Sequence, residues 1–157
     1  MKWVTRERPK IDRIACPWLI RRFIDKDAEI LYVPTAEVMH VAQQQHAVPF
    51  DVPGVELTHD GPRCSFDAIL KKYGLEDPAL VKLATIVRAA DTDSLNLSPQ
   101  APGLLAISLG LGAIFRDDQE LLQTGLAIYD ALYAWRQTLS GERHGWYPDT
   151  VLKEMRT

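Results

Sequence analysis

The 157-residue chain lacks most of the features that mark specialised protein classes. Its two cysteines, Cys16 and Cys64, have no Cys-x-x-Cys spacing, which argues against a disulfide framework and a structural zinc site. The apolar run Gly103 to Phe115 is too short to span a bilayer, and the charged start of the chain is unlike a signal peptide. We therefore expect a cytoplasmic protein with reduced thiols and no membrane partner.

A surplus of positive charge is also missing. The formal net charge is −3, so direct nucleic-acid binding is not expected. The sequence also has no glycine-rich phosphate loop, so no nucleotide cofactor is expected. The charge is nevertheless uneven, because residues 1–26 contain eight Lys or Arg and only three Asp or Glu. A basic pole on an acidic body can attract a small anion, although the same side chains could form an ordinary solvated surface.

The pattern of apolar residues predicts a fold between α/β and α+β, with a small N-terminal α/β layer and a mostly helical C-terminal half. A single domain, 1–157, is the simplest organisation for this length. Thr35 and Ser65 are expected to cap helices. The expected strands span 2–7 and 29–33, an irregular segment spans 48–59, and the expected helices span 17–25, 36–45, 65–74, 78–91, 103–115 and 118–139.

The most informative stretch runs from Asp12 to Asp25 and places Cys16 directly before Pro17. Proline is favoured at the first position of a helix, so a helix is predicted to start at Pro17 with Cys16 at its N-cap. There the helix dipole would stabilise a thiolate or a bound anion, which makes Cys16 a candidate catalytic residue. The alternative is a small buried core residue. The candidate anion-binding residues are Arg13, Cys16, Arg21 and Arg22.

A second cluster combines an imidazole with carboxylates. Glu56 and His59 lie in the turn-rich segment, and Asp91 lies at a helix C-terminus, where the dipole disfavours an anion unless a cation is near. Imidazole plus carboxylate suits Fe(II), Mn(II) or Zn(II), so Glu56, His59 and Asp91 are the predicted metal ligands. A hydrogen-bonded structural histidine and a solvated helix end are the alternatives. The accessory candidates are Cys64, Arg88 and Asp93.

These candidates are expected to meet in one place. Cys16, His59 and Asp91 should share a pocket, and the arginines Arg13 and Arg21 should either hold an anion or pair with the carboxylates of the cluster. The ligand that the sequence predicts is therefore a small inorganic anion, a metal ion, or both.

Six segments are distinctive when taken together: Lys10–Asp25, Phe50–His59, Arg63–Asp67, Ile86–Thr92, Leu104–Leu111 and Tyr129–Trp135. Over roughly residues 3–136, these segments resemble a known family, the ChrB-type chromate-resistance proteins. The resemblance implies a role in sensing or surviving chromate, without a settled chemistry. Longer members carry an additional N-terminal segment associated with regulation; because this chain begins at the shared domain, direct transcriptional control is not expected.

Three functions remain open at this point. The first is a cytosolic domain that binds or senses an oxyanion or a divalent metal in the response to chromate, a tetrahedral dianion that arginine and helix N–H groups can hold. The second is a metal-dependent redox enzyme that uses Cys16 or bound iron or manganese. The third is an interaction module whose helical face, with Tyr133 and Trp135, binds a regulator or a second copy.

Overall fold

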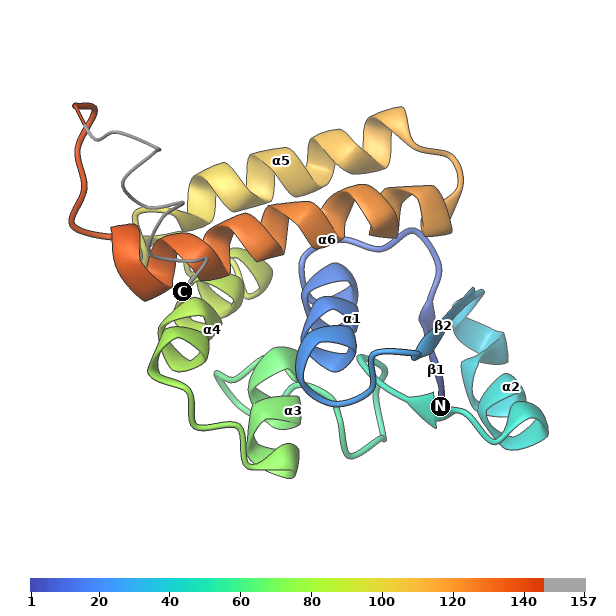
Figure 1. Ribbon diagram of the computed structural model, residues 1–157. Helices are drawn as coiled ribbons and strands as arrows, with labels where there is room; N and C mark the ends of the chain where they lie inside the picture. The colour runs from blue at the N-terminus through green and yellow to red at the C-terminus, as the bar shows by residue number, and fades with distance from the viewer. Residues whose placement is uncertain (146–157) are drawn as a thin grey trace.

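The structure, a computed structural model, describes residues 1–145 (Figure 1). The last part of the expected domain 1–157 lies outside these described residues. The predicted fold class is confirmed: a three-stranded parallel sheet with helices occupies the N-terminal part, and the rest is mostly helical. The elements are β1 Lys2–Arg6, α1 Asp12–Phe23, β2 Glu29–Val33, α2 Val38–Gln45, β3 Val48–Pro49, α3 Ser65–Tyr73, α4 Pro78–Asp91, α5 Ala101–Ile114 and α6 Asp118–Ala134.

The sheet has the order β2-β1-β3, so β1 is its central strand. Successive side chains of a strand point to opposite faces, and β1 uses both of its faces for burial. Trp3 belongs to the main hydrophobic core, whereas Val4 packs with Val38 and Ala42 of α2 in a second, smaller core. The strand thereby separates the peripheral helix α2 from the rest of the molecule (Figure 1).

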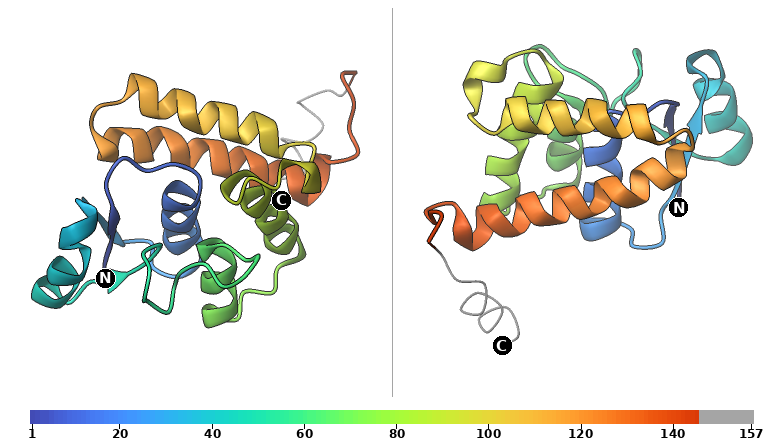
Figure 2. Two further views of the ribbon diagram at one scale, coloured as in Figure 1. Left: turned by 180° about the vertical axis from the view of Figure 1, so that it is seen from behind. Right: turned by 90° about the horizontal axis from the view of Figure 1, so that it is seen from above.

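Helix α1 lies at the centre of the main core, where α3, α4 and α6 pack against it (Figures 1 and 2). Its Ile14 fits against Gly125 of α6, where a Cβ atom would overlap the Ile14 side chain. Trp18 is fully buried, and its indole N–H donates to Asp130 of α6 at 2.7 Å. The N-terminal segment is therefore held in place by helices that come much later in the chain.

The predicted start of the first helix is wrong. Helix α1 begins at Asp12, and Pro17 lies inside it. Because proline has no N–H group, the carbonyl of Arg13 loses its partner in the helix, and the hydroxyl of Tyr32 donates to that oxygen instead, at 2.6 Å. Cys16 is consequently not an N-cap residue but a fully buried member of the core.

Two predicted helix caps also differ. Thr35 begins a short 3₁₀ turn, and α2 starts after it without a side-chain cap. Cys64, not Ser65, is the N-cap of α3, and the Asp67 carboxylate accepts from the Cys64 backbone N–H at 3.0 Å. The Ser65 hydroxyl is thereby free to donate to Asp51 instead.

The later helices lie close to their predicted ranges. Asp77 caps α4, which ends at Asp91 as predicted, and α6 continues after Ala134 as a π-helical turn to Leu139. None of the helices in residues 1–145 combines the length and the apolarity that crossing a membrane requires.

Candidate metal centre

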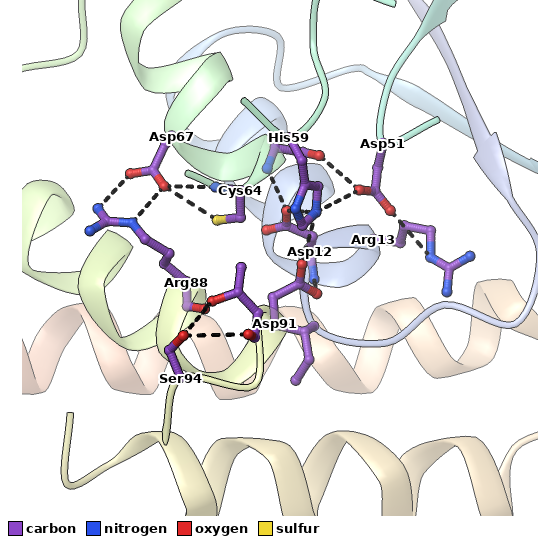
Figure 3. A network of polar contacts seen from close by, with 12 residues as sticks. Asp12, Arg13, Asp51, His59, Cys64, Asp67, Arg88, Asp91 and Ser94 are labelled. Atoms are coloured by element: carbon purple, nitrogen blue, oxygen red, sulfur yellow. Dashed lines mark hydrogen bonds and ion pairs between the residues drawn. The ribbon is translucent and has the colours of Figure 1, made fainter. Parts of the chain in front are cut away.

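Three carboxylates and one imidazole converge where the loop between β3 and α3 meets the start of α1 and the end of α4 (Figure 3). The Nε2 atom of His59, on the loop, lies 3.0 Å from a carboxylate oxygen of Asp91, 3.4 Å from one of Asp51 and 3.6 Å from one of Asp12. Segments far apart in the sequence therefore supply one compact group.

Asp12 is the innermost member of this group. It is fully buried in the first turn of α1, and its Oδ2 accepts a hydrogen bond from the backbone N–H of Ser65 at 2.6 Å. Within residues 1–145 its other oxygen, Oδ1, accepts no hydrogen bond although it is buried. A buried carboxylate oxygen without a partner is costly, so it calls for a cation.

The electrostatics of the group point the same way. Burial, together with the nearby Asp91 and Asp51 carboxylates, raises the pKa of Asp12 well above its usual range. Burial and Asp51 likewise raise the pKa of Asp91. Each ionised carboxylate thus makes the next harder to ionise, and a divalent cation among them would offset both burial and repulsion.

Asp51 is held differently from the other two carboxylates. Its backbone has a φ of 52°, in the left-handed region that non-glycine residues rarely adopt. Its side chain accepts from the Ser65 hydroxyl at 2.7 Å and from Arg6 at 2.8 Å, and the Arg13 guanidinium is 3.6 Å away. Asp51 therefore already has cationic partners, which leaves Asp12 and Asp91 as the carboxylates in need of one.

A cavity of about 220 Å³ opens beside the group. It exposes His59, Asp51 and Asp91 on one part of its wall, and the rest is cationic. Burial, with the neighbouring Arg6, lowers the pKa of the half-buried Arg13. The residues that line the cavity are Arg6, Lys10, Arg13, Asp51, His59 and Asp91.

The ligand atoms of Asp12, His59 and Asp91 all lie within 4.8 Å of one another, which is close enough for one metal ion to bind all three. Together with the unpartnered Asp12 oxygen, this arrangement fits a divalent cation. Three protein ligands leave coordination positions for water or a small molecule, as in catalytic and other open metal sites.

The structure brings together two of the three predicted metal ligands, His59 and Asp91. Glu56 lies apart from them: its exposed carboxylate pairs with Lys72 of α3 at 2.6 Å. The i,i+3 spacing of Glu56 and His59 does not make them converge: Glu56 pairs with Lys72, whereas His59 faces the aspartates. Asp12 occupies the third position of the group instead.

Of the predicted anion-binding residues, only Arg13 reaches the cavity. Arg21 donates to the Ala28 carbonyl at 3.2 Å, and Arg22 forms a two-point ion pair with Asp130 of α6 at 2.7 and 2.8 Å. Cys16 is fully buried, and this burial raises the pKa of its thiol. The four residues do not gather at one place because they point from different sides of α1.

The accessory candidates fall into two groups. Cys64 and Arg88 both contact Asp67: the Cys64 sulfur lies 3.5 Å from it, and the Arg88 guanidinium holds it through two hydrogen bonds of 2.8 Å (Figure 3). Burial raises the pKa of the Cys64 thiol. Asp93 is an exposed residue with a φ of 56° just after α4 and is not part of the metal group.

Four residues of the centre were missed by sequence reasoning: Asp12, Asp51, Arg6 and Lys10. Asp12 could have been identified, because the helix dipole favours an acidic side chain in the first turn of a helix. It was missed because the sequence predicts a helix that begins only at Pro17. Asp51 lies next to the prolines and glycine of the irregular segment, where unusual backbone angles are common. Arg6 and Lys10 carried no local signal.

Comparison with known proteins agrees with the segments that suggested a family. Residues 3–136 match the family model described as ChrB, C-terminal domain. The chain is also 34% identical over 133 residues to Protein ChrB of Cupriavidus metallidurans, an alignment that covers 84% of this chain and 40% of that protein. No solved structure matches. The chain thus spans about two fifths of the length of this relative, and it belongs to the ChrB C-terminal domain family.

Proposed function

We propose that this domain binds a divalent metal ion through Asp12, His59 and Asp91 as part of the response to chromate. The observation that carries the proposal is the Asp12 carboxylate. One of its oxygens, Oδ1, is buried without a hydrogen-bond partner in residues 1–145, and the carboxylate belongs to a group with metal-ligand spacing. The link to chromate rests on membership of the ChrB family.

The ligand set favours Mn(II) or Fe(II). Carboxylate oxygens suit hard cations such as Mn(II), and imidazole suits Fe(II) and Zn(II), so a set with both kinds of atom fits the middle of this range. No thiolate takes part, since both cysteines are buried with raised thiol pKa values. Zn(II) remains the third candidate because it also accepts imidazole and carboxylate ligands.

Calorimetric titration of the metal-free chain with Mn²⁺ tests this proposal. One ion should bind per chain, and the midpoint of thermal unfolding should rise with Mn²⁺ concentration, because a ligand of the folded state stabilises it by mass action. A His59→Ala chain should bind at least tenfold more weakly, whereas Glu56→Gln should bind like the wild type. Absence of binding, or equal losses in both variants, would contradict the proposal.

We further propose that the metal-loaded centre takes up a small oxyanion such as chromate. Arg6, Lys10 and Arg13 balance the three carboxylates of the centre, so a divalent ion leaves a local surplus of two positive charges. The cavity beside the metal group gives an anion access both to open coordination positions and to these cationic side chains. Anion binding should therefore depend on the metal.

Substitution of Lys10 gives the clearest test of anion binding. It lines the cavity without being one of the residues that hold Asp51, so Lys10→Ala should weaken sulfate or chromate binding to the Mn²⁺-loaded chain by about three- to tenfold, the effect of one surface-accessible charge-assisted contact. Mn²⁺ binding itself should change little. The matched control is Lys26→Ala, an exposed lysine away from the cavity. Anion binding that persists without metal, or an equal effect of the two variants, would refute this part.

The open coordination positions of the same centre also support a second candidate function, that of a metal-dependent redox enzyme. Its thiol-based form loses support, because the Cys16 side chain is fully buried in the core. Incubation of the Fe(II)- or Mn(II)-loaded chain with chromate and an added reductant separates the two functions. Consumption of many equivalents of chromate per chain favours the enzyme, whereas saturable binding without turnover favours the binding domain.

A further inference from the structure

Helix α5 presents an outer face that contains no polar side chain. Seen from above (Figure 2, right), α5 lies at the surface with no other described element over it. Ile107 and Leu109 are 50% and 52% exposed, and Ile114 is 73% exposed. The exposed residues of this helix are Pro102, Gly103, Ala106, Ile107, Leu109, Gly110, Ala113 and Ile114.

Two glycines on this face have no role in packing among residues 1–145. A Cβ atom added to Gly103 or Gly110 would meet nothing within 4 Å. Glycine inside a helix lowers its stability relative to alanine, so an exposed helical glycine needs another reason. Gly125 shows the contrast within the same protein, because there the Ile14 side chain occupies the space of the missing Cβ. Close approach of a second backbone would explain the two glycines of α5.

Large and small residues alternate along this face, so that the face of one copy can fit against the same face of a second copy. Positions 103, 107, 110 and 114 follow one another at intervals of four, three and four residues, so they form a single stripe along the helix. The stripe reads Gly, Ile, Gly, Ile. When two copies pair antiparallel about its midpoint, Ile107 of one copy lies over Gly110 of the other, and Ile114 lies over Gly103. Parallel pairing would instead place isoleucine over isoleucine.

The apolar character and the lack of charge of the face also favour a second copy. Ile107 and Ile114 of the stripe are each at least half exposed, and packing them against a second copy would remove their apolar surface from water. No Lys or Arg lies within α5, whereas helices that bind membrane surfaces are rich in both. A charged protein surface would likewise find no counter-charge on this face.

We propose that two copies of this chain associate through an antiparallel α5–α5 contact in which Ile107 and Ile114 of each copy pack over Gly110 and Gly103 of the other. This contact is independent of the metal centre, which lies on other elements, and it does not rest on the proposed function.

Sedimentation of the whole chain over a range of concentrations tests the association. The wild type should be a dimer, and Ile107→Glu should raise the dimer dissociation constant at least tenfold. Val81→Glu on α4 is the matched control, because Val81 is 52% exposed on another helix, and it should leave the dimer intact. A wild type that stays monomeric to millimolar concentration, with or without binding to neutral phosphatidylcholine vesicles, would overturn the proposal, as would equal effects of both variants.

Cross-linking tests the orientation. Antiparallel pairing brings position 103 of one copy opposite position 114 of the other. The two copies of position 103, and likewise the two copies of position 114, are then about 16 Å apart along the helices. Chains with Gly103→Cys should therefore form disulfides with chains carrying Ile114→Cys only when the two are mixed. Self-linking of either variant alone, without linking in the mixture, would contradict the antiparallel pairing. In addition, Gly110→Ala should raise the thermal stability of the monomer yet weaken the dimer.

Discussion

An Asp12→Asn chain is expected to bind Mn²⁺ at least about a hundredfold more weakly than the wild type, a loss of about 2.7 kcal/mol. The substitution removes the buried charge but keeps the shape of the side chain and an oxygen that can accept the Ser65 N–H. In the metal-free chain, burial and the neighbouring carboxylates make an ionised Asp12 unfavourable, as its raised pKa indicates. The metal-free variant should therefore be as stable as the wild type, or more stable.

This combination separates a ligand from a structural residue. A purely structural aspartate would lose stability on substitution, whereas a ligand loses metal affinity and spares the metal-free fold. Asp93→Asn is the matched control, since Asp93 is exposed near the end of α4 and outside the ligand group, and it should bind Mn²⁺ normally. Wild-type affinity in Asp12→Asn would remove Asp12 from the centre; a strongly destabilised metal-free variant would make it structural.

Arg88→Met should lower the free energy of unfolding by roughly 2–3 kcal/mol, because it leaves the buried Asp67 carboxylate without its charged partner. Asp67 is 4% exposed at its side chain, and Arg88 contacts it through two nitrogens at 2.8 Å. The pair joins the start of α3 to the last turns of α4, one turn before Asp91. The Lys82→Met variant, at an exposed position of the same helix, should change stability little.

The effect of Arg88→Met should depend on pH. Burial by itself raises the pKa of Asp67, but the hydrogen bonds from Arg88 and from the Cys64 N–H outweigh it and lower the pKa below the usual value. The ionised pair therefore stabilises the fold above the unfolded pKa of about 3.8, and this stabilisation is lost as the pH falls through the lower folded value. Chemical unfolding at neutral and acidic pH should show the wild-type advantage shrinking in acid. A constant difference between the two chains would contradict this account.

The elements of the fold were mostly predictable because their signals are local. The strand at 29–33 and the helix at 78–91 are bounded by charged residues and prolines that act within a few positions of the chain. The start of α1 was not predictable from such signals. Pro17 lies inside the helix, and the hydroxyl of Tyr32, on the strand that follows, donates to the carbonyl that the proline leaves free. A tertiary contact thus overrode a local rule.

The centre was predictable only in part for the same reason. His59 and Asp91 were identifiable by chemistry, because an imidazole in a loop and a carboxylate at an unfavourable helix end both suggest a cation. The pairing of Arg22 with Asp130 and of Glu56 with Lys72 depends on which elements meet in space, and the sequence does not indicate it. The contribution of Asp12 became visible only once its helix start and its unpartnered oxygen were known.

The position of the metal ion itself is the most direct test of the account. Crystals of the whole chain grown with Mn²⁺ should show one anomalous scattering peak at about 2.1 Å from His59 Nε2 and from one carboxylate oxygen each of Asp12 and Asp91, with its remaining positions facing the cavity. A peak held by Glu56 or by surface carboxylates, or no peak at a saturating Mn²⁺ concentration, would contradict it.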